Sequence, residues 1–115
     1  MLTLDKLKEF GADTSEGLAR CMNNEDFYLK MVGMGIGDER FETIKDVLEK
    51  KDWDAAFEMA HALKGVLGNL ALTPIYTPMS EMTELLRAKV ADADYMSYYK
   101  QVKEQRDRLL NMIHG

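Results

Sequence analysis

The chain has little cysteine, which could cross-link the fold, and little proline, which interrupts helices and strands. Its 115 residues include one cysteine, two prolines and one tryptophan. A lone cysteine, Cys21, cannot form an internal disulfide, which excludes a disulfide-stabilised scaffold and favours a reducing compartment. A chain of this length can bury a sizeable core without a disulfide or a metal. We therefore expect one domain over residues 1–115.

Long apolar runs and concentrated positive charge are also missing. No window approaches the roughly 20 apolar residues that a membrane-spanning helix needs, and the first segment, MLTLDKLKEF, lacks the apolar run of a signal peptide. The net charge is −5, with basic residues scattered among acidic ones, whereas nucleic-acid-binding proteins concentrate theirs. These features predict a cytoplasmic protein, monomeric by default, that binds neither nucleic acid nor membrane.

Apolar residues at helical spacing dominate the rest of the sequence, and no useful strand-like alternation occurs. Helices are predicted over residues 4–10, 15–22, 25 to about 36, 40–50, 53–70 and 94–113. One more helix ends near Val90 and begins at either Thr73 or Thr77, because threonine caps helices and a proline follows each of these two. Short connections between helices of similar length favour antiparallel neighbours in a bundle.

Several residues mark the predicted helix ends. Thr3 caps the first helix and Gly11 closes it. Asn23 and Asn24 mark a stop and a restart, and Asp52 caps the helix that follows it. These signals are local, so they predict boundaries without reference to the rest of the fold.

The segment AHALKGVLGNL, residues 60–70, places two glycines inside a predicted helix, each costing roughly 1 kcal/mol relative to alanine. On a helical wheel, one side collects the apolar residues Ala56, Met59, Ala60, Leu63, Val66, Leu67 and Leu70. His61, Lys64, Gly65 and Gly68 lie on the opposite side. We interpret the glycines as a bare strip of backbone that lets a large partner reach His61, with Lys64 one turn away.

The segment HALKG, residues 61–65, followed by Gly68 and Asn69, resembles the H-x-L-K-G signature of histidine phosphotransfer (HPt) domains. The upstream run FETIKDVLEKKDWDAAFEMAHALKG is also similar to that family, including the aspartate that starts the histidine-bearing helix. The similarity covers about residues 18–86. Motif and surrounding pattern together make the resemblance specific.

Two positions depart from the family pattern. Val66 stands where many members have a small residue, and Ala71 stands where a glycine is often found. Both lie away from the face that carries His61 or at its far end. The resemblance implies an all-α fold: an up-down four-helix bundle with a short covering N-terminal helix.

The resemblance also implies an activity. HPt domains take a phosphoryl group from an aspartyl phosphate on one receiver domain and pass it to another in two-component phosphorelays. In this sequence, His61 would accept the group through Nε2, Lys64 would neutralise charge on its oxygens, and Gly65 and Gly68 would leave room for the receiver. An imidazole with an unperturbed pKa of about 6.5 is substantially neutral in the cytoplasm, so it needs no dedicated base.

The partners implied are receiver domains of a hybrid histidine kinase or a response regulator, and the receiver would supply the Mg²⁺ and the acidic pocket. No cofactor is expected on this chain, and nothing in it is typical of an ATP site, so we expect a phosphoryl carrier without kinase activity. Asn69 joins the glycines as a partner-binding candidate. Phe57, about 40° from His61 on the wheel, is either covered by a flanking helix or a docking contact.

The alternative function is a phosphate-independent helical adaptor that binds a receiver or another partner through the same face. Other motifs are weaker. GMGIG, residues 33–37, follows a helix rather than a strand and lacks the ending of a phosphate-binding loop, so we predict a plain loop. His114 has no ligand partners at metal-binding spacing, so no metal site is expected. Cys21 has no activating motif beside it and is predicted as half-buried filler.

Overall fold

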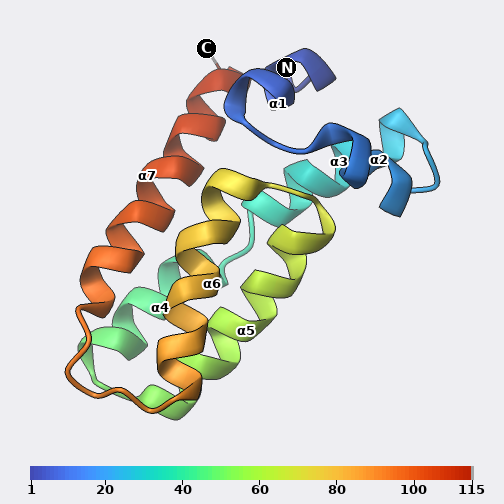
Figure 1. Cartoon of the computed structure of the whole chain (residues 1–115). Coiled ribbons are helices and arrows are strands. Elements are labelled where there is room, and N and C mark those ends of the chain that lie inside the picture. Colours follow the sequence, from blue (N-terminus) through green and yellow to red (C-terminus); the bar gives the residue numbers. More distant parts are fainter. Residues whose placement is uncertain (115) are drawn as a thin grey trace.

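The computed structural model describes residues 1–114, which fold into seven helices (Figure 1). They are α1 (Leu4–Phe10), α2 (Thr14–Arg20), α3 (Glu25–Ile36), α4 (Arg40–Glu49), α5 (Trp53–Asn69), α6 (Thr73–Arg87) and α7 (Tyr95–His114). Helix α6 packs against both α5 and α7, and α4 contacts the same two helices, which closes a four-helix bundle. Figure 1 shows α1 and α2 across one end of it. The predicted all-α bundle is confirmed, and the three helices predicted before residue 40 are present, where the family resemblance implied one short covering helix.

Helix boundaries that depend on local caps agree with the sequence prediction. Thr3 Oγ1 accepts a hydrogen bond from the Lys6 N–H at 3.1 Å, and Asp52 Oδ1 accepts one from the Ala55 N–H at 3.3 Å. Gly11 ends α1 in the left-handed region with φ 110°, where a side chain would be strained. Each signal involves only residues a few positions apart, which is why the sequence alone located it.

The sequence offers two threonines as starts for α6, and in the structure the helix begins at the earlier one. Thr73 is the first helical residue and not the cap that was predicted, because the N-cap is Leu72, which makes no side-chain capping hydrogen bond. Pro74 lies in the first turn, and Pro78 lies inside the helix. Thr77 is therefore not a cap, and its Oγ1 instead donates to the Thr73 carbonyl at 3.1 Å. Helix α6 ends at Arg87, three residues before the predicted position.

The N-terminal half departs from the prediction in two places. Helix α2 spans Thr14–Arg20 with Asp13 as its cap, so Met22 lies outside it, exposed and in the left-handed region at φ 57°. Helix α3 continues through Gly33 to Ile36, so the helix predicted to about residue 36 is confirmed and the loop predicted for residues 33–37 is wrong. A Cβ atom at Gly35 would lie 2.7 Å from a methyl carbon of Leu70, so glycine lets α3 approach α5 closely at this point.

The buried side of α5 is the one that the helical wheel predicts. Ala56, Ala60, Leu63 and Leu67 are fully buried, and the opposite side of the helix faces solvent. Burial of this apolar stripe determines how α5 is rotated in the bundle. None of the helices described in residues 1–114 has both the length and the apolar character needed to cross a membrane.

A buried tyrosine fixes the covering helices to the end of α5. Tyr28 is fully buried, and its hydroxyl donates to the Leu70 carbonyl at 2.8 Å. Gly17 lies directly on this ring, since a Cβ atom there would be 2.5 Å away. The Asp13 N–H donates to the Ala71 carbonyl at 3.0 Å. Helix α2 is thereby held beside the exposed side of α5, where it forms part of the candidate site.

Candidate functional site

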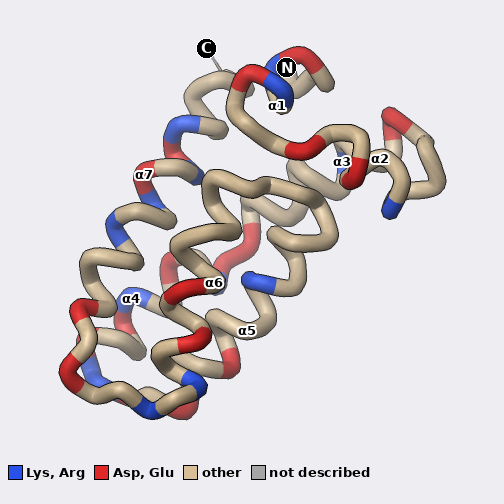
Figure 2. Tube along the Cα trace, viewed as in Figure 1, with Lys and Arg blue, Asp and Glu red and all other residues tan. Residues whose placement is uncertain are grey.

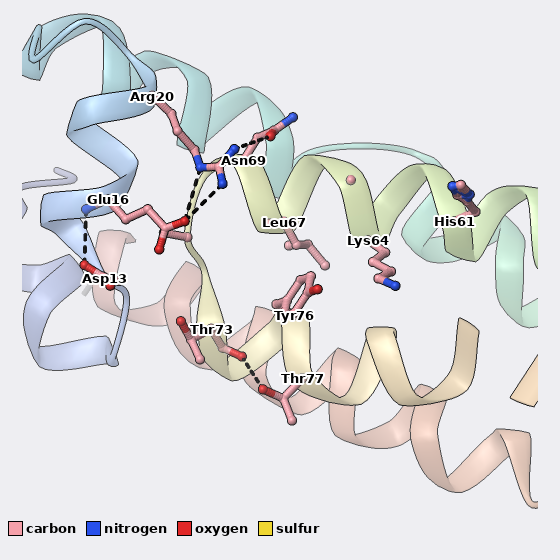
Figure 3. Close-up of a pocket in the computed structure, with 13 residues that line it drawn as sticks. Asp13, Glu16, Arg20, His61, Lys64, Leu67, Asn69, Thr73, Tyr76 and Thr77 are labelled. Carbon is pink, nitrogen blue, oxygen red and sulfur yellow. Dashed lines mark hydrogen bonds and ion pairs between the residues drawn. The ribbon is translucent and has the colours of Figure 1, made fainter. Parts of the chain in front are cut away.

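His61 lies on the exposed side of α5, one turn before Lys64 (Figure 3). Gly65 is exposed as well, and a Cβ atom built there would meet no other described element within 4 Å. The buried stripe on the other side of α5 fixes this orientation. The structure therefore brings His61 and Gly65 together on an open strip of backbone that another molecule can approach.

Gly68 has a different environment from the one predicted. It is half-buried, and a Cβ atom there would lie 3.2 Å from Cε2 of Tyr76 on α6. The interpretation of both glycines as a bare strip of backbone is wrong for Gly68, because its missing side chain makes room for the tyrosine ring. Figure 3 shows Tyr76 beneath α5, between the two helices.

Phe57 lies directly beside the histidine. The two ring centroids are 5.6 Å apart, with a tilt of 59° between the planes. The guanidinium carbon of Arg87, from α6, lies 5.1 Å from the Phe57 centroid, within the range of a cation–π contact. Phe57 is half-buried, so a residue of the flanking helix α6 covers part of the ring, and its role as a docking contact stays a prediction.

Lys64 is not free in this structure. Its Nζ donates to Oε1 of Glu84 on α6 at 2.9 Å, and Nε of Arg87 donates to the other oxygen, Oε2, at 3.1 Å. The Lys64 hydrogen bond holds the pKa of the Glu84 carboxyl below its ordinary value; partial desolvation opposes this shift, and the Arg87 hydrogen bond adds to it. Figure 2 shows the basic position on α5 and acidic positions on the neighbouring α6.

Sequence reasoning missed Glu84 and Arg87. Their positions relative to His61 depend on where α6 begins and how it is rotated, and the sequence left the start of α6 open between Thr73 and Thr77. The sequence does contain one useful signal: Arg87 follows Glu84 by three positions, and residues at this spacing lie on the same face of a helix and can form an ion pair. That spacing alone does not say which helix the pair faces.

A second charged cluster lies at the other end of the strip. Nη1 of Arg20 donates to Oδ1 of Asn69 at 3.2 Å, and Arg20 also donates to Glu16 Oε1 from Nε at 3.3 Å and from Nη2 at 3.1 Å. Asn69, predicted as a partner-binding residue, is therefore held by α2. Its side chain remains exposed at the edge of the strip.

An open groove of about 550 Å³ joins the two ends of this surface (Figure 3). His61 and Lys64 line one end, and Glu16 and Arg20 line the other. Neither His114 nor Cys21 lines the groove. Cys21 is buried, whereas the sequence predicted it to be half-buried. The groove therefore places the His61 imidazole and the Lys64 side chain on one concave surface.

Comparison with known families identifies the class of protein. A model of the Hpt domain matches residues 37–113, well over half of the chain. The chain therefore belongs to the Hpt domain family. The match takes in α4 to α7, so it begins and ends later in the sequence than the resemblance suggested. No curated protein and no solved structure gave a significant match.

Family membership defines the general function. Hpt domains take part in histidine phosphotransfer within two-component phosphorelays, where they interact with receiver domains. They are phosphoryl carriers and not kinases. The exposed imidazole on α5 is consistent with that role.

Proposed function

We propose that this chain relays a phosphoryl group between receiver domains, with His61 as the acceptor. The observation that carries the proposal is the exposed imidazole on α5 beside Gly65, where no side chain blocks an approaching protein. In the transfer step, the lone pair of Nε2 forms a bond to phosphorus while the bond from phosphorus to the donor's aspartate oxygen breaks. The electron pair leaves with that carboxylate, and Nδ1 keeps its proton. Transfer to a second receiver is the reverse of this step.

The surroundings of His61 meet the demands of this chemistry. Phosphoryl transfer passes through a loose transition state and depends mainly on in-line placement and charge neutralisation. Contact with Phe57 limits how the ring can turn, and Lys64 supplies a cation one turn away. Gly65, Gly68 and Asn69 would form the surface that the receiver contacts, with Mg²⁺ and the acidic pocket coming from the receiver.

The test is transfer from a phosphorylated receiver, followed by intact mass spectrometry. The wild-type chain should gain the mass of one phosphoryl group, and the label should be labile in acid and stable in alkali. His61→Gln should gain none while keeping its helical circular dichroism. His114→Gln is the matched control, because that residue is exposed at the far end of α7 and should leave uptake unchanged.

Two outcomes would overturn the proposal. Uptake that survives His61→Gln would place the phosphoryl group elsewhere. Receiver binding that is unaffected by His61→Gln, with no uptake by the wild type, would favour the adaptor function instead.

A further inference from the structure

Lys64, one turn along α5 from His61, and Arg87 on α6 share one carboxylate. Glu84 accepts hydrogen bonds from Lys64 through one oxygen and from Arg87 through the other. Arg87 in turn lies over the ring of Phe57, which contacts His61. These contacts form a chain from the imidazole across to α6 and back to the lysine that follows it by one turn.

Burial differs within this cluster. The side chain of Lys64 is 25% exposed, whereas that of Glu84 is 53% exposed. The lysine stem is therefore largely packed, and its ammonium is held by Glu84 on α6. The carboxylate is the more solvated partner, and exposed ion pairs of this kind contribute little to stability.

Phosphorylation of His61 would add negative charge near Lys64, Glu84 and Arg87. A phosphoryl group brings close to two negative charges and strong acceptor oxygens. Lys64 is already paired, so the phosphoryl group on His61 has to compete with Glu84 for the same ammonium. The negative charge of Glu84 also remains nearby and opposes the new one.

We propose that Glu84 is a positioning residue that sets how favourable phosphorylation of His61 is. Before transfer it binds Lys64 and Arg87 on the side of the groove formed by α6. After transfer it yields Lys64 to the phosphoryl group, and its own charge keeps the phosphorylated state from becoming too stable to pass the group on. This inference rests on the proposed function and concerns the equilibrium of the same transfer step.

The test is the equilibrium constant between a phosphorylated receiver and the chain, measured from both directions with the same receiver. Glu84→Gln keeps the size of the side chain and removes the charge, so it should shift the equilibrium toward phosphorylated His61 by about 3- to 10-fold. Lys64→Ala should shift it in the opposite direction. Glu84→Asp retains the charge and should stay near the wild-type value.

A charge-matched control separates a local effect from net charge. Glu104→Gln changes the same charge on an exposed position of α7 and should leave the equilibrium constant unchanged. An unchanged constant for Glu84→Gln, a shift away from phosphorylated His61, or an equal shift for Glu104→Gln would each overturn the inference. If the wild-type chain takes up no phosphoryl group at all, the proposed function fails first, and the two failures are thus distinguishable.

Discussion

On one side of α5, Leu63 and Leu67 are fully buried, and on the other side His61 and Gly65 face solvent. The buried side is specified by apolar volume, and cores of this kind accept many residues of similar size. The open side depends on the reactive imidazole of His61 and on the missing side chain of Gly65. No other residue of similar size provides either property. The comparison teaches that the buried side decides where α5 lies, and the open side decides what can react with it.

Substitution on the buried side should have the largest effect on stability. Leu63→Ala removes a fully buried side chain, and we expect it to lower the free energy of unfolding by about 2–5 kcal/mol. Urea denaturation followed by circular dichroism measures this. Lys64→Ala, the next residue on the open side, is the control and should change stability by less than about 1 kcal/mol. Similar losses for both variants would contradict the distinction between the two sides.

Substitution of the two glycines sharpens the same comparison with a smaller effect. Gly65→Ala meets no neighbour and should stabilise the chain by about 0.5–1 kcal/mol, because alanine favours a helix over glycine. Gly68→Ala should gain less than this or lose stability, since its methyl group would lie 3.2 Å from Tyr76. Thermal or urea unfolding measures both variants. An equal rise in the free energy of unfolding for the two would show that Gly68 is as open as Gly65.

The smallest expected effect is the pH dependence of the ion pair on the open side. The folded-state pKa of Glu84 is lowered, first by its hydrogen bond from Lys64. Its contribution to stability is therefore complete above the carboxyl's ordinary pKa and is lost as pH falls through the lower folded-state value. The stability difference between wild type and Glu84→Gln should shrink as urea unfolding is repeated from pH 7 down to pH 3. A difference in the free energy of unfolding that grows as the pH falls would contradict a stabilising role for this ion pair.

The sequence predicted the parts of this molecule that depend on nearby residues. The caps at Thr3 and Asp52 involve residues three positions apart. The two faces of α5 follow from helical periodicity, so the exposure of His61 was predictable. The aspartate, histidine and lysine spacing also carried the family resemblance that the match to residues 37–113 confirms.

The parts that it missed depend on contacts between helices. The sequence predicted a helix to about Ile36 but interpreted residues 33–37 as a loop, because it could not show that Gly35 lies against Leu70, far along the chain. The same holds at Gly68, whose environment is set by Tyr76 on α6. Glu84 reaches Lys64 only because α6 has a particular start and rotation, and two Thr-Pro pairs left that start ambiguous.

The most direct test of the central claim is to locate the phosphoryl group on the chain. After transfer from a phosphorylated receiver, the protein labelled with ¹⁵N-histidine can be examined by NMR for coupling between ring nitrogen and phosphorus. Our account predicts that coupling at Nε2 of His61 alone. Phosphorus bonded at His114, at Nδ1 of His61 or at a residue other than histidine would contradict it.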